Sequence, residues 1–135
     1  MTQGIKMAFV VSMFASLFLA EATLAHHAFA AEFDKERPVR LTGRVTEMRW
    51  ANPHAWIYID VEGENGDVVN WALETRGANN LIRLGWRPAD LTVGTILEVQ
   101  GFRARNNTPT ANLEEATLPD GRRLFSGSPD SPGSQ

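Results

Sequence analysis

The stretch PVRLTGRVTEMRW, residues 38–50, reads as one strand whose inward-facing pattern changes partway along. In its first half, small and apolar residues share one face: Val39, Leu41, Gly43 and Val45. Beyond them, Met48 and Trp50 continue the apolar pattern with the opposite parity. A one-residue slip of this kind is produced by a β-bulge, and Gly43 permits strong curvature beside it. Because a small barrel must bend a strand sharply in order to close, this stretch favours a barrel.

Two further strands follow and form a hairpin. Residues 54–61 (HAWIYIDV) alternate between an aliphatic face and an aromatic or polar face, as a half-buried strand does. Residues 62–67 are polar and contain the pair Asn65-Gly66, which is a strong hairpin signal. Residues 68–75 (VVNWALET) then return as the third strand.

The periodicity changes after the third strand. Residues 78–84 (ANNLIRL) predict a short helix, and Gly85 stands where the C′ glycine of a helix belongs. Trp86 would then pack back on Leu81, which is the hydrophobic contact of a Schellman cap.

The rest of the chain is again typical of strands. Residues 91–105 contain a turn at Gly94 and a fourth strand, residues 111–118 predict a fifth, and residues 121–125 a short last one. Three strands, a short helix and two more strands is the order of a small OB-like β-barrel. The predicted class is therefore all-β with one short helix, and a curved β-sandwich capped by the helix is the alternative.

The N-terminal residues are typical of a secretory signal peptide. Lys6 supplies a basic start, residues 7–20 are uncharged and apolar, and Glu21 ends the run. A helix of that length spans roughly 21 Å, which is too short for a hydrocarbon core of roughly 30 Å. We therefore expect a protein that is exported to the periplasm or secreted, and that is not an integral membrane protein after processing.

Two cleavage positions fit the small-x-small rule for signal peptidase. Cleavage after Ala22 releases Thr23 as the first residue, and cleavage after Ala25 releases His26. The choice matters, because a chain that begins at His26 places an α-amine beside an imidazole.

The composition limits the classes of function. We assign residues 1–25 to the signal peptide, 26–125 to a single domain, and 126–135, rich in Ser, Pro and Gly, to a disordered tail. The 135-residue chain has a formal net charge of −3, so we expect no nucleic-acid binding, which relies on clustered Lys and Arg. It contains no cysteine, which excludes disulfides, thiolate metal sites and cysteine nucleophiles.

The histidines are the best candidates for chemistry. If the mature chain begins at His26, its α-amine and imidazole can chelate one metal ion, and a third nitrogen would complete a T-shaped set suited to Cu(II). That nitrogen comes from His27, the direct neighbour, or from His54, which lies in the sequence Asn52-Pro53-His54 before the second strand. The prediction is a metal site, with copper as the ion, formed from these three histidines. The alternative is a mobile leader and a turn histidine that is hydrogen-bonded locally.

A second hypothesis needs no metal. Trp50, Trp56 and Tyr58 lie on or beside the central strands, with Asn52 between them in the chain. An exposed face carrying Trp56 and Tyr58 would stack on a small ligand or receive a protein partner. The alternative is that these rings fill the barrel or pack beneath the N-terminal segment.

The sequence contains no catalytic motif. Its carboxylates show no spacing that indicates acid–base catalysis, and there is no G-x-S-x-G element or phosphate-binding glycine loop. Glu74 stands in an otherwise apolar strand, and we expect a rim ion pair with a partner such as Arg76. These observations favour a binding protein over an enzyme.

Several segments together resemble a family of small exported bacterial proteins, known as the domain of unknown function six-one-five-two. They are AHHAFAAEFD, LTGRVTEMRWANPHAWIYIDV, NWALET, LIRLGW and LTVGTILEVQGFRAR, within residues 25–125. The resemblance implies export and a compact β fold, and it implies no activity. It also implies a His-His-x-Phe element near the processed N-terminus, at His26, His27 and Phe29. Ala28 stands where a serine is common in the family.

Overall fold

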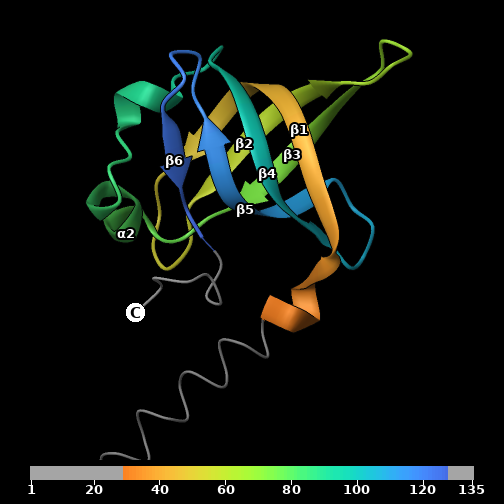
Figure 1. Cartoon of the computed structure of the whole chain (residues 1–135), viewed down its shortest axis with the longest axis horizontal. Coiled ribbons are helices and arrows are strands. Elements are labelled where there is room, and N and C mark those ends of the chain that lie inside the picture. Colours follow the sequence, from red (N-terminus) through yellow and green to blue (C-terminus); the bar gives the residue numbers. More distant parts are fainter. Residues whose placement is uncertain (1–28, 128–135) are drawn as a thin grey trace, which may run out of the picture.

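The computed structural model describes residues 29–127. Six strands make up one sheet, with a short α-helix and a 3-10 helix between the third and fourth strands (Figure 1). The elements are β1 (Phe33–Arg49), β2 (Trp56–Glu62), β3 (Val68–Glu74), α2 (Ala78–Arg83), η1 (Pro88–Leu91), β4 (Ile96–Ala104), β5 (Thr110–Thr117) and β6 (Arg123–Phe125).

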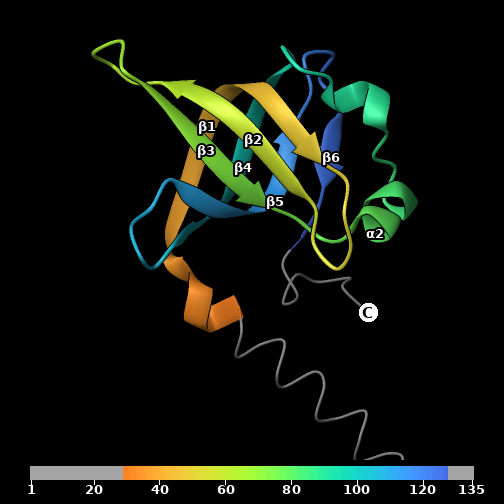
Figure 2. The ribbon, with the colours of Figure 1, turned by 180° about the vertical axis from the view of Figure 1, so that it is seen from behind.

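The sheet closes on itself. β1 pairs antiparallel with both β2 and β4, β2 pairs with β3, and β4 pairs with β5. A parallel pairing of β3 with β5, through Ala72–Thr110 to Glu74–Asn112, completes the ring (Figure 2). The all-β prediction with a short helix is confirmed, and the single ring of strands replaces the alternative of a two-sheet sandwich.

The bulge predicted in the first strand is confirmed. The register between β1 and β2 shifts between Val45 and Glu47, so Val45 pairs with Ile59 whereas Glu47 pairs with Tyr58. Gly43 lies just before this shift, where a β-carbon would be 2.8 Å from the main-chain oxygen of Asp60. The absence of a side chain at Gly43 therefore lets β2 approach closely where β1 curves.

The core lies inside the ring, and aliphatic side chains from every long strand contribute to it. Its largest fully buried side chain is Trp86, which follows α2. The amide of Trp86 donates to the carbonyl of Leu81 and the amide of Gly85 to that of Ile82, which is the Schellman pattern predicted from the sequence. Gly85 has φ of 96°, which only glycine adopts without strain.

A second, smaller apolar cluster lies outside the ring. β1 begins at Phe33, five residues before the expected start, because Phe33 pairs with Ala104 at the end of β4. Residues 29–32 form a helical turn before it. Phe29, Phe33 and Ala104 are buried together, with Phe102 packed against them.

Arg105 fixes this N-terminal segment to β4. Its Nε donates to the carbonyl of Ala30 at 2.7 Å, and its amide donates to the carbonyl of Glu32 at 2.9 Å. Its guanidinium also lies 3.4 Å from the carboxylate of Asp34. The chain from Phe29 onward is therefore held against the outer surface of β4.

The chain remains part of the fold slightly beyond β6. Ser126, assigned to the tail from the sequence, is buried, and its amide donates to the carbonyl of Glu114. The amide of Gly127 donates to the same carbonyl at 3.0 Å, whereas residues 128–135, like the expected signal peptide, lie outside the described residues. Between residues 29 and 127, no helix is long and apolar enough to cross a membrane.

Candidate functional site

His54 and Glu74 form a polar pair on the outer surface of the ring. Nδ1 of His54 is hydrogen-bonded to Oε1 of Glu74. The side chain of His54 is 55% exposed, whereas that of Glu74 is only 8% exposed. A buried carboxylate is costly unless it is hydrogen-bonded, so His54 acts as its partner. Glu74 is thus buried, and the expectation of a rim carboxylate is wrong.

This pairing engages one ring nitrogen of His54 and leaves Nε2 as the other. When Nδ1–H donates to the carboxylate, a neutral imidazole carries its free lone pair on Nε2. A carboxylate behind a histidine in this way orients the ring and raises its strength as a metal ligand. His54 is therefore arranged to offer Nε2 to an electrophile or a metal ion.

The loop that carries His54 is fixed by α2. Oδ1 of Asn52 accepts from the amide of Asn79 at 3.3 Å, and so caps a helix whose own N-cap residue, Gly77, has no side chain. The carbonyl of Ala51 accepts from the amide of Ala78 at 2.9 Å. Asn52, predicted as a ligand-binding residue, thus positions the loop in this structure.

Four residues in register form a line across the outside of the sheet, which we call the outer row: Trp56, Glu74, Asn112 and Phe102. Trp56 pairs with Glu74 on β3, Glu74 with Asn112 on β5, and Asn112 with Phe102 on β4. The strand neighbours Ile57, Leu73, Ala111 and Leu113 belong to the core, so Trp56, Glu74 and Asn112 face outward. Phe102 packs with the separate cluster of Phe29, Phe33 and Ala104. His54 precedes Trp56 by two residues and lies at one end of the row.

The other end of the row meets the N-terminal segment. The ring of Phe29 packs edge-on against that of Phe102, with 6.4 Å between the centroids. His26 and His27, the other predicted metal ligands, lie outside the described residues, three and two positions before Phe29. Within residues 29–127 there is no group of three or more His, Cys, Asp or Glu side chains able to hold a metal ion.

Other side chains of the protein already pack against the aromatic residues that were predicted to bind a ligand. Trp50 packs against the core. Trp56 and Tyr58 are half-buried on the outer face, and the guanidinium of Arg49 lies 4.8 Å from the centre of the Tyr58 ring. Arg49 also donates to Glu47, and this hydrogen bond lowers the pKa of that carboxyl. The stacking surface expected at Tyr58 is therefore shared with an arginine.

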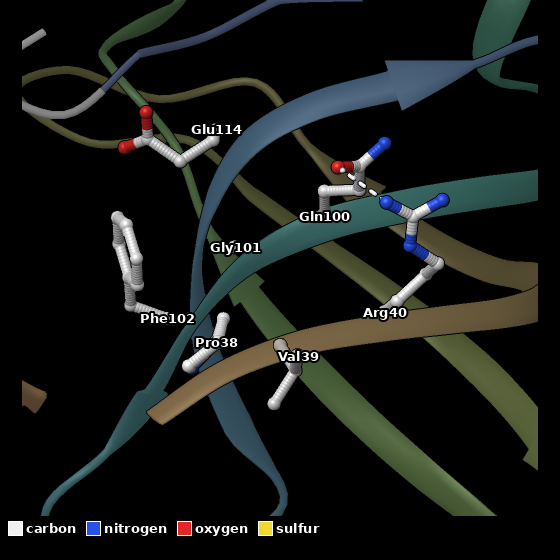
Figure 3. A pocket seen from close by; sticks show the side chains of 7 residues that line it. All are labelled: Pro38, Val39, Arg40, Gln100, Gly101, Phe102 and Glu114. Atoms are coloured by element: carbon white, nitrogen blue, oxygen red, sulfur yellow. Dashed lines mark hydrogen bonds between the residues drawn. The ribbon is translucent and has the colours of Figure 1, made fainter. Parts of the chain in front are cut away.

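A shallow hollow of about 370 Å³ lies elsewhere on the outer surface, between β1, β4 and β5. In Figure 3 Phe102 and Pro38 lie toward one side of it, and Arg40 and Gln100 toward the other, joined by a hydrogen bond of 3.2 Å. Its remaining lining residues are Val39, Gly101 and Glu114. The hollow shares only Phe102 with the outer row, so it is separate from the pair of His54 and Glu74.

Sequence reasoning did not identify Glu74 and Asn112 as site residues. The only signal for Glu74 is a carboxylate in an apolar strand, and Asn112 shows none. The two residues lie side by side only because β3 pairs with β5, and this pairing joins segments almost forty residues apart.

The fold and the site define a small all-β protein with a histidine presented on a buried carboxylate. A family model described as a family of unknown function (DUF6152) matches residues 15–112, and the chain belongs to that family. Searches of curated proteins and of solved structures found no match.

Proposed function

We propose that this protein is a small exported metal-binding protein, and that His54 supplies one imidazole ligand to Cu(II). The α-amine and imidazole of His26 supply the others after the signal peptide is removed, and His27 is the alternative to His54 for the third nitrogen. The set of nitrogen donors suits Cu(II).

The observation that carries the proposal is the state of His54. Its Nδ1 is engaged by a carboxylate that is 8% exposed, while the imidazole itself is 55% exposed. Histidines that ligate metals usually donate their second ring N–H in this way.

The position of Phe29 gives additional support. Neighbouring strands are about 4.8 Å apart, so Phe102 and Glu74 lie about 10 Å apart along the outer row. Three residues of extended chain span about 10 Å. Because Phe29 is fixed on Phe102, His26 has enough chain to approach His54.

The test is Cu(II) affinity, measured by competition with a chelator of known strength, on protein exported and processed by a bacterial host. Intact mass establishes the first residue of the same sample. We expect His54→Ala to lower the affinity by orders of magnitude and Glu74→Gln to lower it about 10- to 100-fold. Glu47→Gln, which changes an exposed carboxylate elsewhere on the surface, is the matched control and should have no effect.

Protons compete with the metal for nitrogen ligands, so we expect affinity to fall below about pH 6. An affinity that is unchanged in His54→Ala would remove this residue from the site. That result would favour the second hypothesis, a metal-free domain that binds a small ligand or a protein through Trp56 and Tyr58. This hypothesis has less support because Arg49 already lies over the ring of Tyr58.

A further inference from the structure

The shallow hollow between β1, β4 and β5 is built on two cross-strand pairs. Arg40 of β1 lies directly opposite Gln100 of β4, and Pro38 lies directly opposite Phe102. The two pairs are two residues apart along both strands, so all four side chains project from the same face of the sheet. We call Arg40 with Gln100 the donor pair, and Pro38 with Phe102 the apolar pair.

The donor pair offers N–H groups and a positive charge to a ligand. Nη2 of Arg40 donates to Oε1 of Gln100 at 3.2 Å, so the acceptor atom of the pair is already engaged. Among residues 29–127, the amide nitrogen of Gln100 and the other nitrogens of Arg40 have no hydrogen-bond partner, and Arg40 forms no ion pair. A carboxylate, which accepts hydrogen bonds and carries a negative charge, is the complement of this pair.

The apolar pair lines the other side of the hollow (Figure 3). Phe102 is half-buried, and although its ring packs against that of Phe29, it also lines the hollow together with Pro38. Val39 and Gly101 complete the lining between the two pairs, and Gly101 adds no side chain to fill the space. A ring on a ligand packs favourably on an aromatic side chain, with centroids roughly 4.5–7 Å apart.

Glu114 is the one acidic residue in the lining, and a bulge places it there. The register between β4 and β5 shifts between Gln100 and Gly101, which makes Glu114 the extra residue of β5. Bulges redirect a side chain and are common beside binding sites. In Figure 3 Glu114 lies on the side of Phe102, away from Arg40, so a ligand carboxylate at the donor pair is kept apart from it.

We propose that the hollow binds a small organic carboxylate that carries an apolar ring. The carboxylate accepts hydrogen bonds from Arg40 and Gln100, and the ring packs on Phe102 and Pro38. Residues two apart on a strand are about 7 Å apart, which sets the distance between the two groups of the ligand. The hollow, of about 370 Å³, has the size of a small-ligand site. Because His54 is not part of it, this binding needs no metal.

The experiment titrates the exported, processed protein, free of metal, with phenylpropionate and follows ¹H–¹⁵N correlation spectra. We expect saturable shifts of the Gln100 side-chain amide and of the backbone amides of Arg40 and Phe102, with a Kd on the order of 1 mM. Phenylpropionamide has the same shape without the charge and should bind about tenfold more weakly. Acetate, which lacks the ring, should give no saturable shifts over the same concentrations.

Variants of the donor pair test the assignment of the residues. Arg40→Gln removes the charge and Gln100→Leu removes the amide at similar volume, and each should weaken phenylpropionate binding about five- to tenfold. Arg44→Gln is the matched control. Arg44 is also an exposed arginine of β1, but it donates to the carbonyl of Gly94 and does not line the hollow, so its loss should leave the Kd unchanged. Unchanged spectra for residues outside the hollow establish that the variants are folded.

Three results would overturn the inference. The first is the absence of saturable shifts at Arg40, Gln100 and Phe102 in the wild type. The second is equal affinity for phenylpropionate and phenylpropionamide, since the charge of the donor pair would then have no part in binding. The third is an unchanged Kd in Arg40→Gln.

Discussion

Gly77 connects the fold to the position of His54, and its replacement by alanine tests that connection. Gly77 has φ of −61° and ψ of 154°, an extended conformation that alanine also adopts without strain. A β-carbon there would lie 2.5 Å from Oδ1 of Asn52 and 2.6 Å from the carbonyl oxygen of Pro53. Any cost of Gly77→Ala therefore arises from collision with the loop that carries His54.

The magnitude follows from two contributions. Inserting a methyl group into a filled space costs about 1–3 kcal/mol. If Asn52 moves away, α2 also loses the side chain that caps it, which costs about 1 kcal/mol. We expect Gly77→Ala to lower the free energy of unfolding by about 2–4 kcal/mol, which is a large share of a typical total of about 5–15 kcal/mol.

The assay is urea unfolding followed by tryptophan fluorescence. With a dependence on urea of about 2 kcal/mol per molar, the midpoint should fall by about 1–2 M. Gly63→Ala is the matched control, because a β-carbon at Gly63 would meet only the oxygen of Asp67, at 3.4 Å. It should change stability by less than about 0.5 kcal/mol. Equal midpoints for the two variants would refute the reasoning.

Two further predictions concern the C-terminal part of the fold. Trp86→Phe removes the 2.9 Å hydrogen bond from Nε1 to the carbonyl of Phe125. We expect this change to lower the free energy of unfolding by about 1–2 kcal/mol. The measurement is urea unfolding, and an unchanged midpoint would contradict the prediction. Hydrogen bonds from Arg122 hold the pKa of Asp120 below its ordinary value, so the folded state binds fewer protons there than the unfolded state. Asp120 therefore contributes stability above the unfolded pKa of about 3.9, and the contribution is lost as the pH falls through the lower folded value. As the pH is lowered below about 4, the urea midpoint of Asp120→Asn should fall less steeply than that of the wild type. Parallel profiles of midpoint against pH for the two proteins would count against this contribution of Asp120.

Local patterns predicted the parts of the fold that depend on local physics. The parity change in residues 38–50 predicted the bulge at Val45 and Glu47, and Gly85 with Trp86 predicted the Schellman cap. The early start of β1 was missed because residues 33–37 show no alternation. Their pairing with β4 passes through an irregular register between Phe33 and Pro38.

The candidate site was only partly predictable for the same reason. His54 was identified because histidines are few in this chain and this one stands at the start of the predicted second strand. The burial of Glu74 depends on the closure of β3 on β5 and on the loop before β2, which no single window of sequence contains. Asn112 lies opposite Glu74 through that same pairing, so its place beside Glu74 depends on the ring as a whole.

The central claim is that His54 ligates copper together with the processed N-terminus. It is tested most directly by Cu(II) electron paramagnetic resonance on exported protein whose intact mass begins at His26, with His54→Ala compared under the same conditions. We predict one tight axial site with nitrogen couplings in the wild type, and the loss of one nitrogen coupling in His54→Ala. Identical spectra for the two proteins, or only weak multiple sites in the wild type, would contradict the claim.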